Sequence, residues 1–183
     1  LSPTNTMLWN LDTTHANVDF SVKHMAISTV RGSFNLFSAS GETDDATGLP
    51  TKLSMEIDAT SVNTNNEQRD GHLKSPDFFD VANHPKITFT STKISGTPGE
   101  LTIVGDLTIR GVTKPVTLTG ELSSAMKDPW GLQRCSLEVA GKIKRSEFGL
   151  TWNQALEMGG VLVSDEVKLA VSAQAVAAVP AAA

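Results

Sequence analysis

The sequence is short of several residue types, and each shortage narrows what the chain can be. Cys135 is the only cysteine among 183 residues, so an internal disulfide is excluded. Tyrosine is absent, and there are only seven phenylalanines and three tryptophans. No apolar run approaches the ~18–20 residues that a membrane-spanning helix requires. Fifteen basic against twenty acidic residues give a net charge of −5, which disfavours non-specific nucleic-acid binding.

Motifs for common chemistries are also missing. The four histidines form neither a His-x-x-x-His pair nor a His-Glu-x-x-His motif, so we expect no metal site. There is no Gly-x-Ser-x-Gly elbow and no phosphate-binding glycine loop. Cys135 has no histidine near it in the sequence, and a cysteine in a strand is usually inert packing. We therefore expect no catalytic residue and no cofactor.

The chain is rich instead in alternating apolar and polar residues. In segment 18–24, Val18, Phe20, Val22 and His24 share one face, and polar residues occupy the other. A turn is expected before it, at residues 13–17. About eight segments alternate in this way and are joined mostly by short turn signals, which favours an antiparallel barrel or sandwich. Polar faces on every strand suit a wet outside and a dry inside.

One polar insertion interrupts the strands, and we predict a short helix there, at about residues 64–75. Thr64 and Glu67 have the spacing of a capping box, and Ser75-Pro76 ends the helix because the residue before proline leaves the α region. Two large rings, Phe78 and Phe79, follow at once. We expect this segment to cap one end of a barrel that holds an apolar ligand.

The expected inner face carries mostly medium and small side chains. An eight-stranded barrel is either just filled by its side chains or holds one small ligand. Inward glycines at Gly105, Gly120 and Gly141 favour the hollow alternative, and a filled core stays open as the other. The residues expected to line the tunnel are Phe20, Val22, His24, Phe34, Leu36, Met55, Ile57, Phe78, Phe79, Ile87, Phe89, Leu107, Leu118, Val139, Phe148, Trp152 and Met158.

A few polar residues leave two interpretations open. Arg69, Asp70 and His72 form either a head-group site at the tunnel mouth or a network that anchors the helix. Arg145 is either a phosphate contact at the rim or part of a strand-end hydrogen-bond network. His24 is either a core histidine or a polar tip inside the tunnel.

Several motifs in order resemble the YceI family of lipocalin-like, polyisoprenoid-binding proteins. They include VDFSVKHM at 18–25, RDGHLKS at 69–75, GDLTIRGVTKPV at 105–116 and KRSEFG at 144–149, and the resemblance covers residues ~8–176. It implies an extended, lipocalin-like antiparallel β-barrel with a long internal tunnel. It also implies an isoprenoid, quinone-like or fatty amide ligand, a homodimer in many members, and no enzymatic activity.

The expected organisation is one barrel domain at residues 8–176, between a flexible extension at 1–7 and a flexible Ala-rich tail at 177–183. The low-complexity run that starts at Ala173 is expected to fray. A periplasmic or secreted location is favoured if Leu1 follows a removed signal peptide, and a cytoplasmic one if Met7 is the start.

The function expected from these patterns is non-catalytic binding, transport or storage of an elongated apolar lipid. Two alternatives are kept. One is an enzyme acting on a lipid or isoprenoid diphosphate, with His24, Arg69, Asp70 or His72 in the reacting role. The other is a ligand-free structural or stress-response module with a filled barrel.

Overall fold

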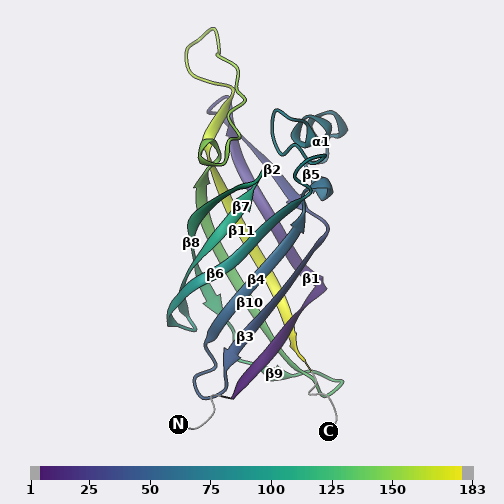
Figure 1. The fold of residues 1–183 in the computed structure, drawn as a ribbon, viewed down its shortest axis with the longest axis vertical. Coiled ribbons are helices and arrows are strands. Elements are labelled where there is room, and N and C mark those ends of the chain that lie inside the picture. The colour runs from purple at the N-terminus through teal and green to yellow at the C-terminus, as the bar shows by residue number, and fades with distance from the viewer. Residues whose placement is uncertain (1–4, 179–183) are drawn as a thin grey trace.

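Antiparallel strands wrap around one axis in the computed structural model, which describes residues 5–178 (Figure 1). Hydrogen bonds connect them in the order β11-β10-β8-β7-β6-β4-β3-β1, and β1 pairs again with β11, so eight strands close a barrel. The all-β antiparallel barrel predicted from the sequence is confirmed. The strands are β1 (Thr6–His24), β2 (Ser28–Phe34), β3 (Phe37–Asp44), β4 (Pro50–Asp58), β5 (Val62–Asn63), β6 (Lys86–Thr97), β7 (Glu100–Ile109), β8 (Val112–Leu122), β9 (Met126–Lys127), β10 (Gln133–Lys144) and β11 (Val163–Ala177).

β1 is the longest strand and pairs with three other strands. Its first residues pair with β3 and its last with β2, while its other edge pairs with β11 from Trp9 to His24. The turn predicted at residues 13–17 is wrong, because β1 continues through it with a register shift between Asp12 and Ala16. The carboxylate of Asp12 accepts hydrogen bonds from the backbone N–H and hydroxyl of Thr14, which accommodates the extra residues locally.

The alanine-rich run at the end of β11 is strand rather than frayed chain. Residues 173–177 pair with β1 on one side, and residues 173–176 pair with β10 on the other. The expected fraying from Ala173 is therefore wrong as far as Ala177. At the other end, β1 begins at Thr6. The domain boundaries at 7/8 and 176/177 stay predictions, and residues 1–4 and 179–183 lie outside the described residues.

The predicted helix is present and shorter than expected. It is α1 (Glu67–Lys74), and two short 3₁₀ turns lie elsewhere, at Ala59–Ser61 and Arg145–Phe148. Its N-cap is Asn66, whose side chain accepts the N–H of Arg69 at 2.9 Å, so the capping box predicted at Thr64 is wrong. Ser75 is the C-cap, as the Ser75-Pro76 stop predicted.

The packed core lies toward the end of the barrel that α1 covers. It joins the final residues of β4 and β7 to the segment after α1, through buried Ile57, Ile109 and Phe78. Arg110 fastens that segment to the β7–β8 turn, since its guanidinium donates to the carbonyls of Pro76 and Phe78 at 2.5 and 2.7 Å. α1 is thus held over one end of the barrel by both apolar packing and hydrogen bonds (Figure 1).

The wall glycines act differently from what the sequence predicted. A Cβ at Gly105 would lie 2.3 Å from the Phe89 ring, and one at Gly32 would lie 2.3 Å from the Phe20 ring. Leu118 covers Gly141 in the same way, and Gly120 faces the backbone of Glu138. The glycines therefore do not leave gaps in the wall. They let neighbouring side chains lie flat against the sheet, a known use of strand glycine.

We predict that Gly105→Ala destabilises the barrel by about 1–3 kcal/mol, because the new methyl group overpacks against Phe89 and the carbonyl oxygen of Thr90. Gly71→Ala is the matched control. It meets no atom within 4 Å in α1, so it should stabilise the protein by roughly 0.5–1 kcal/mol. Urea unfolding of both variants measures the difference, and equal stabilities would contradict the close packing at Gly105.

An ion-pair cluster joins strands at the end of the barrel away from α1, which we call the lower end (Figure 1). Arg134 on β10 bridges Asp12 on β1 at 2.7 Å and Asp128 at 3.2 Å. Hydrogen bonds from Thr14, His15 and Arg134, in that order of effect, hold the pKa of the Asp12 carboxyl well below its usual range.

A carboxyl with a lowered pKa stabilises the fold above about pH 4, and this stabilisation is lost as the pH falls below that value. We therefore predict that Asp12→Asn unfolds at a lower temperature than wild type at pH 7, and that the gap narrows from about pH 5 toward pH 2. Asp106→Asn, at an exposed position on β7, controls for the change in net charge. A difference in unfolding temperature between wild type and Asp12→Asn that does not change with pH would contradict this account.

Candidate functional site

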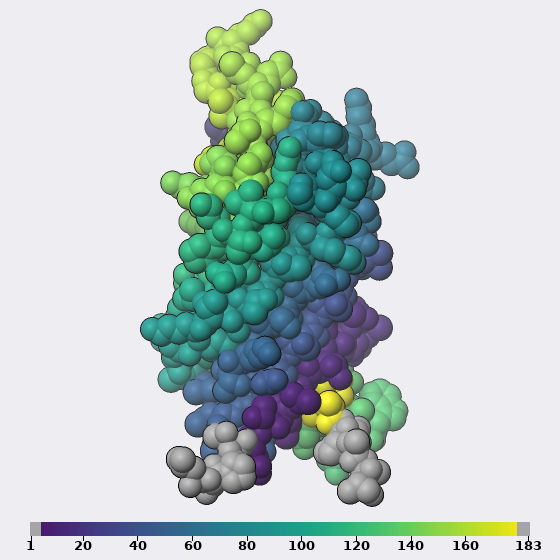
Figure 2. Space-filling model, viewed as in Figure 1, coloured from purple at the N-terminus to yellow at the C-terminus, as the bar shows by residue number. Residues whose placement is uncertain are grey.

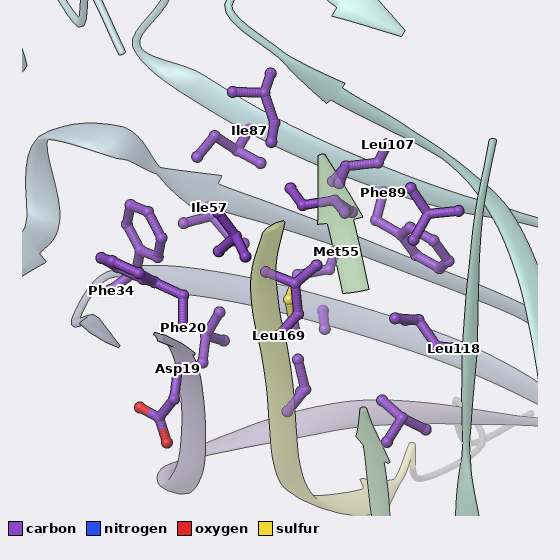
Figure 3. Close-up of a pocket in the computed structure, with 18 of the residues that line it drawn as sticks. Asp19, Phe20, Phe34, Met55, Ile57, Ile87, Phe89, Leu107, Leu118 and Leu169 are labelled. Carbon is purple, nitrogen blue, oxygen red and sulfur yellow. The ribbon is translucent and has the colours of Figure 1, made fainter. Parts of the chain in front are cut away.

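A cavity of about 410 Å³ lies inside the barrel (Figure 3). Side chains from all eight wall strands face it, and it extends from Trp9 and Ala175 near the lower end to Trp152 and Leu73 beneath the α1 end. This volume falls within the range of ~300–1,000 Å³ typical of small-molecule sites. The described barrel is therefore hollow, which contradicts the filled-core alternative.

The apolar lining follows from the strand period and the register. Met55 on β4 lies opposite Phe89 on β6, and Phe89 in turn lies opposite Leu107 on β7. One step along, Ile57 pairs with Ile87. Figure 3 shows these side chains reaching into the same space, while the carboxylate of Asp19 lies at its margin. Because side chains alternate along a strand, each such row puts its apolar members inside and its polar neighbours in water.

An aromatic cluster lines the α1 end of the cavity. The His72 ring stands edge-on to Trp152, with centroids 4.6 Å apart, and to Phe78 at 5.1 Å. Phe78 and Trp152 are 5.5 Å apart, so α1 and the loop that follows β10 meet through these three rings. His72 is also fixed by a 2.9 Å hydrogen bond to the carboxylate of Asp77. Edge-to-face contacts of this kind add roughly 0.5–1.5 kcal/mol beyond burial.

The polar residues of α1 are joined through Thr64. The Thr64 hydroxyl donates to Asp70 at 2.6 Å and accepts from Arg69 Nε at 2.8 Å. Arg69 also donates to the Thr64 carbonyl at 2.8 Å. These bonds fit the interpretation in which Arg69 and Asp70 belong to a network that anchors the helix. Arg69 and His72 line the cavity as well, whereas Asp70 does not.

Arg145 anchors the long loop between β10 and β11. Its guanidinium donates to four backbone carbonyls, those of Leu150, Trp152, Val163 and Ser164, at 2.7–3.2 Å. Burial lowers its pKa, and the nearby Asp165 carboxylate partly offsets that effect. The donors point into the loop backbone, so the geometry is that of the strand-end network rather than of a rim phosphate contact.

Most residues predicted to line the tunnel do face the cavity. They are Phe20, Val22, His24, Phe34, Met55, Ile57, Phe78, Phe79, Ile87, Phe89, Leu107, Leu118, Val139 and Trp152.

Three of the predicted tunnel residues do not face the cavity. Leu36 is 60% exposed, because β2 and β3 run in the same direction along β1 and the chain between them, at residues 35–36, leaves the strand and interrupts the alternation. Met158 is 95% exposed at the tip of the β10–β11 loop. Phe148 is buried in the core, but it lies in the 3₁₀ turn after β10 rather than on a wall strand.

The sequence reasoning missed the lower part of the lining. Trp9, Leu11, Cys135, Ala173 and Ala175 face the cavity there. The signal was present as a continued period-two pattern, Val171-Ala173-Ala175, but the low complexity of the segment made it resemble a tail. Burial raises the pKa of the Cys135 thiol to about 11, so this thiol is a poor nucleophile at neutral pH.

The cavity wall is mainly apolar, and His24, Arg69 and His72 are among the polar side chains that line it. Within residues 5–178, no direct hydrogen bond joins any two of His24, Arg69, Asp70 and His72, and no group of three or more His, Cys, Asp or Glu is placed to hold a metal ion. In the same part of the chain, no helix is long and apolar enough to cross a membrane.

Comparisons with known proteins agree with this geometry. The family model of the YceI-like domain matches residues 9–175. Protein YceI of Escherichia coli is 41% identical over 162 residues, which cover 88% of this chain and 82% of that protein.

Two solved structures are similar over most of their length. A YceI protein from Campylobacter jejuni is 35% identical, with a TM-score of 0.74 over 84% of this chain and 88% of that one. A domain from Saccharophagus degradans, described as polyisoprenoid-binding, shares the fold at 18% identity, with a TM-score of 0.67 over 93% of this chain and 98% of that one. On the strength of the family match and these identities, the chain belongs to the YceI-like family.

Proposed function

We propose that this protein binds an elongated apolar lipid in the barrel cavity and carries or stores it without chemical change. The candidate ligands are isoprenoid, quinone-like or fatty amide molecules. One observation carries the proposal: a cavity of about 410 Å³ with apolar walls runs from the lower end of the barrel to the ring cluster under α1. The description of the Saccharophagus degradans domain as polyisoprenoid-binding supports the same class of ligand.

Burial of hydrocarbon alone is sufficient for useful affinity. Each buried methylene contributes roughly 0.8 kcal/mol, so about fifteen give at most ~12 kcal/mol. Association costs at least ~4 kcal/mol. At most ~8 kcal/mol remains, which corresponds to a dissociation constant of about 1 μM at the tightest. A carrier therefore needs no reactive group in this cavity.

The polar groups at the α1 end favour one orientation of the ligand. Arg69 and His72 line the cavity there, next to the rings of Phe78 and Trp152. The lower end is lined by Trp9, whose indole N–H donates to Thr43, and by alanines of β11. We infer that a polar head group lies toward α1 and the hydrocarbon chain toward the lower end.

Filling the cavity should abolish binding while a substitution on the outer face does not. Met55→Trp adds bulk where β4 faces the cavity, and Glu56→Trp places the same side chain at the next, exposed position. Each purified protein is extracted with organic solvent, and the amount of lipid per mole of protein is measured by mass spectrometry. We predict at least a tenfold loss for Met55→Trp and wild-type content for Glu56→Trp. No lipid in the wild type, or equal content in all three proteins, would contradict the proposal.

Cys135 reports on the same cavity. Because its pKa is about 11, we predict that alkylation by iodoacetamide rises about tenfold per unit between pH 8 and pH 10. Farnesol, an isoprenoid alcohol, should slow the reaction by occupying the space beside the thiol. Cys135→Ser controls for labelling elsewhere. A rate that levels off below pH 9 and ignores farnesol would show that the thiol does not face a dry cavity.

A further inference from the structure

Four apolar side chains project into solvent at the α1 end of the barrel. Ile27 is 81% and Met25 41% exposed in the β1–β2 turn, and Met158 is 95% and Val161 50% exposed in the β10–β11 loop. We call these four residues the apolar prong. Figure 2 shows the loop, in yellow-green, standing above the rest of the molecule. Exposed apolar residues are unremarkable when scattered singly, but a group on adjacent segments marks an interaction surface.

Hydrogen bonds join the two segments of the prong. The N–H of Met25 donates to the carbonyl of Leu162 at 2.8 Å. Within the loop, Ala155 and Val161 form an antiparallel bridge, and the N–H of Leu156 donates to Gly160 at 3.1 Å. The prong is thus a built feature, in which the loop is tied to the end of β1.

The β1–β2 turn keeps its apolar residues at a cost in backbone energy. Met25 and Ala26 have φ angles of 54° and 60°, in the left-handed region that a two-residue hairpin turn normally fills with Asn-Gly. Non-glycine residues are strained there, and such strain gathers at functional sites. Apolar residues that are kept at a strained and exposed turn point to a use outside the folded barrel.

The prong adjoins the cavity. His24 and Leu162, which are the chain neighbours of Met25 and Val161, both line it. We propose, resting on the lipid-carrier function, that the prong inserts into the surface of a lipid bilayer. The α1 end of the barrel then faces the membrane, and an elongated lipid passes between bilayer and cavity without crossing bulk water.

The expected bilayer is one with neutral head groups. The chain carries a net charge of −5, and the tip of the loop includes the exposed Glu157, so anionic lipids offer no electrostatic attraction. Binding then depends on the apolar area inserted, and salt should change it little. A protein partner for the same surface is the alternative that the test below distinguishes.

Exposed apolar residues at the opposite end provide a matched control. Trp130 is 80% and Met126 68% exposed there, beside Lys127 and the Asp128–Arg134 ion pair. These two residues resemble the prong in size and exposure, but they lie in and just after β9, which is at the end of the barrel away from α1 (Figure 1).

The experiment is flotation of the full chain with phosphatidylcholine vesicles. We expect the wild type to float with the vesicles, the Ile27→Ser, Met158→Ser double variant to lose at least tenfold in partition, and the Met126→Ser, Trp130→Ser double variant to behave as wild type. Thermal unfolding checks that all three proteins fold. A wild type that does not float overturns the docking proposal and leaves a protein partner as the alternative. An equal loss in the control also overturns it, because vesicle binding is then not specific to the prong.

This outcome is separable from that of lipid binding. If solvent extraction finds lipid but the wild type ignores vesicles, docking is wrong and the carrier function stands. If vesicles bind through the prong but the cavity holds no lipid, the carrier function is wrong and membrane docking stands by itself.

Discussion

The pairing of β1 with β11 closes the sheet on itself. It runs from Trp9 to His24 on one strand and from Ala177 back to Val163 on the other, and it leaves the barrel without an open edge between these two long strands. Closure fixes the distance between opposite walls, because strand number and tilt set the diameter of a barrel. Whether the interior is filled then depends only on the side chains that the strands present to it.

Those side chains are too short, or lie too flat, to meet across the axis. Phe20 and Phe89 fold against Gly32 and Gly105 instead of projecting toward the opposite wall. Elsewhere the lining includes small aliphatic side chains, such as Val139 on β10 and Ala173 on β11. The result is an apolar space with its larger rings gathered at the α1 end, where the ring cluster joins the helix to the β10–β11 loop. The homodimer implied by the family resemblance remains a prediction.

The sequence predicted the parts of this fold that depend on local pattern. Alternation placed residues such as Met55, Ile57 and Leu107 on the inner face. Ser75-Pro76 marked the end of α1 because proline restricts its neighbour sterically. These features need only a few adjacent residues to be read correctly.

What the sequence did not predict depends on contacts between distant residues. Thr64 and Asn66 both suit an N-cap, and the bonds of Thr64 to Arg69 and Asp70 decide between them. Leu36 continues the inward pattern of β2 in the sequence, but it lies in the break between β2 and β3. A glycine in a wall strand can leave a gap or can make room for a neighbouring ring. At Gly105 the packing of Phe89 shows that it makes room for a ring. The four residues of the prong are apolar, and nothing in the local sequence shows that they face water.

The hollow barrel is the central claim, and a crystal structure of the protein purified without added lipid tests it most directly. Met55 on β4 and Val139 on β10 are four strands apart around the barrel and face each other across it. The account predicts that these side chains stay apart, with elongated electron density between them along the axis. Direct contact between them, with no continuous space from Trp9 to Trp152, would contradict it.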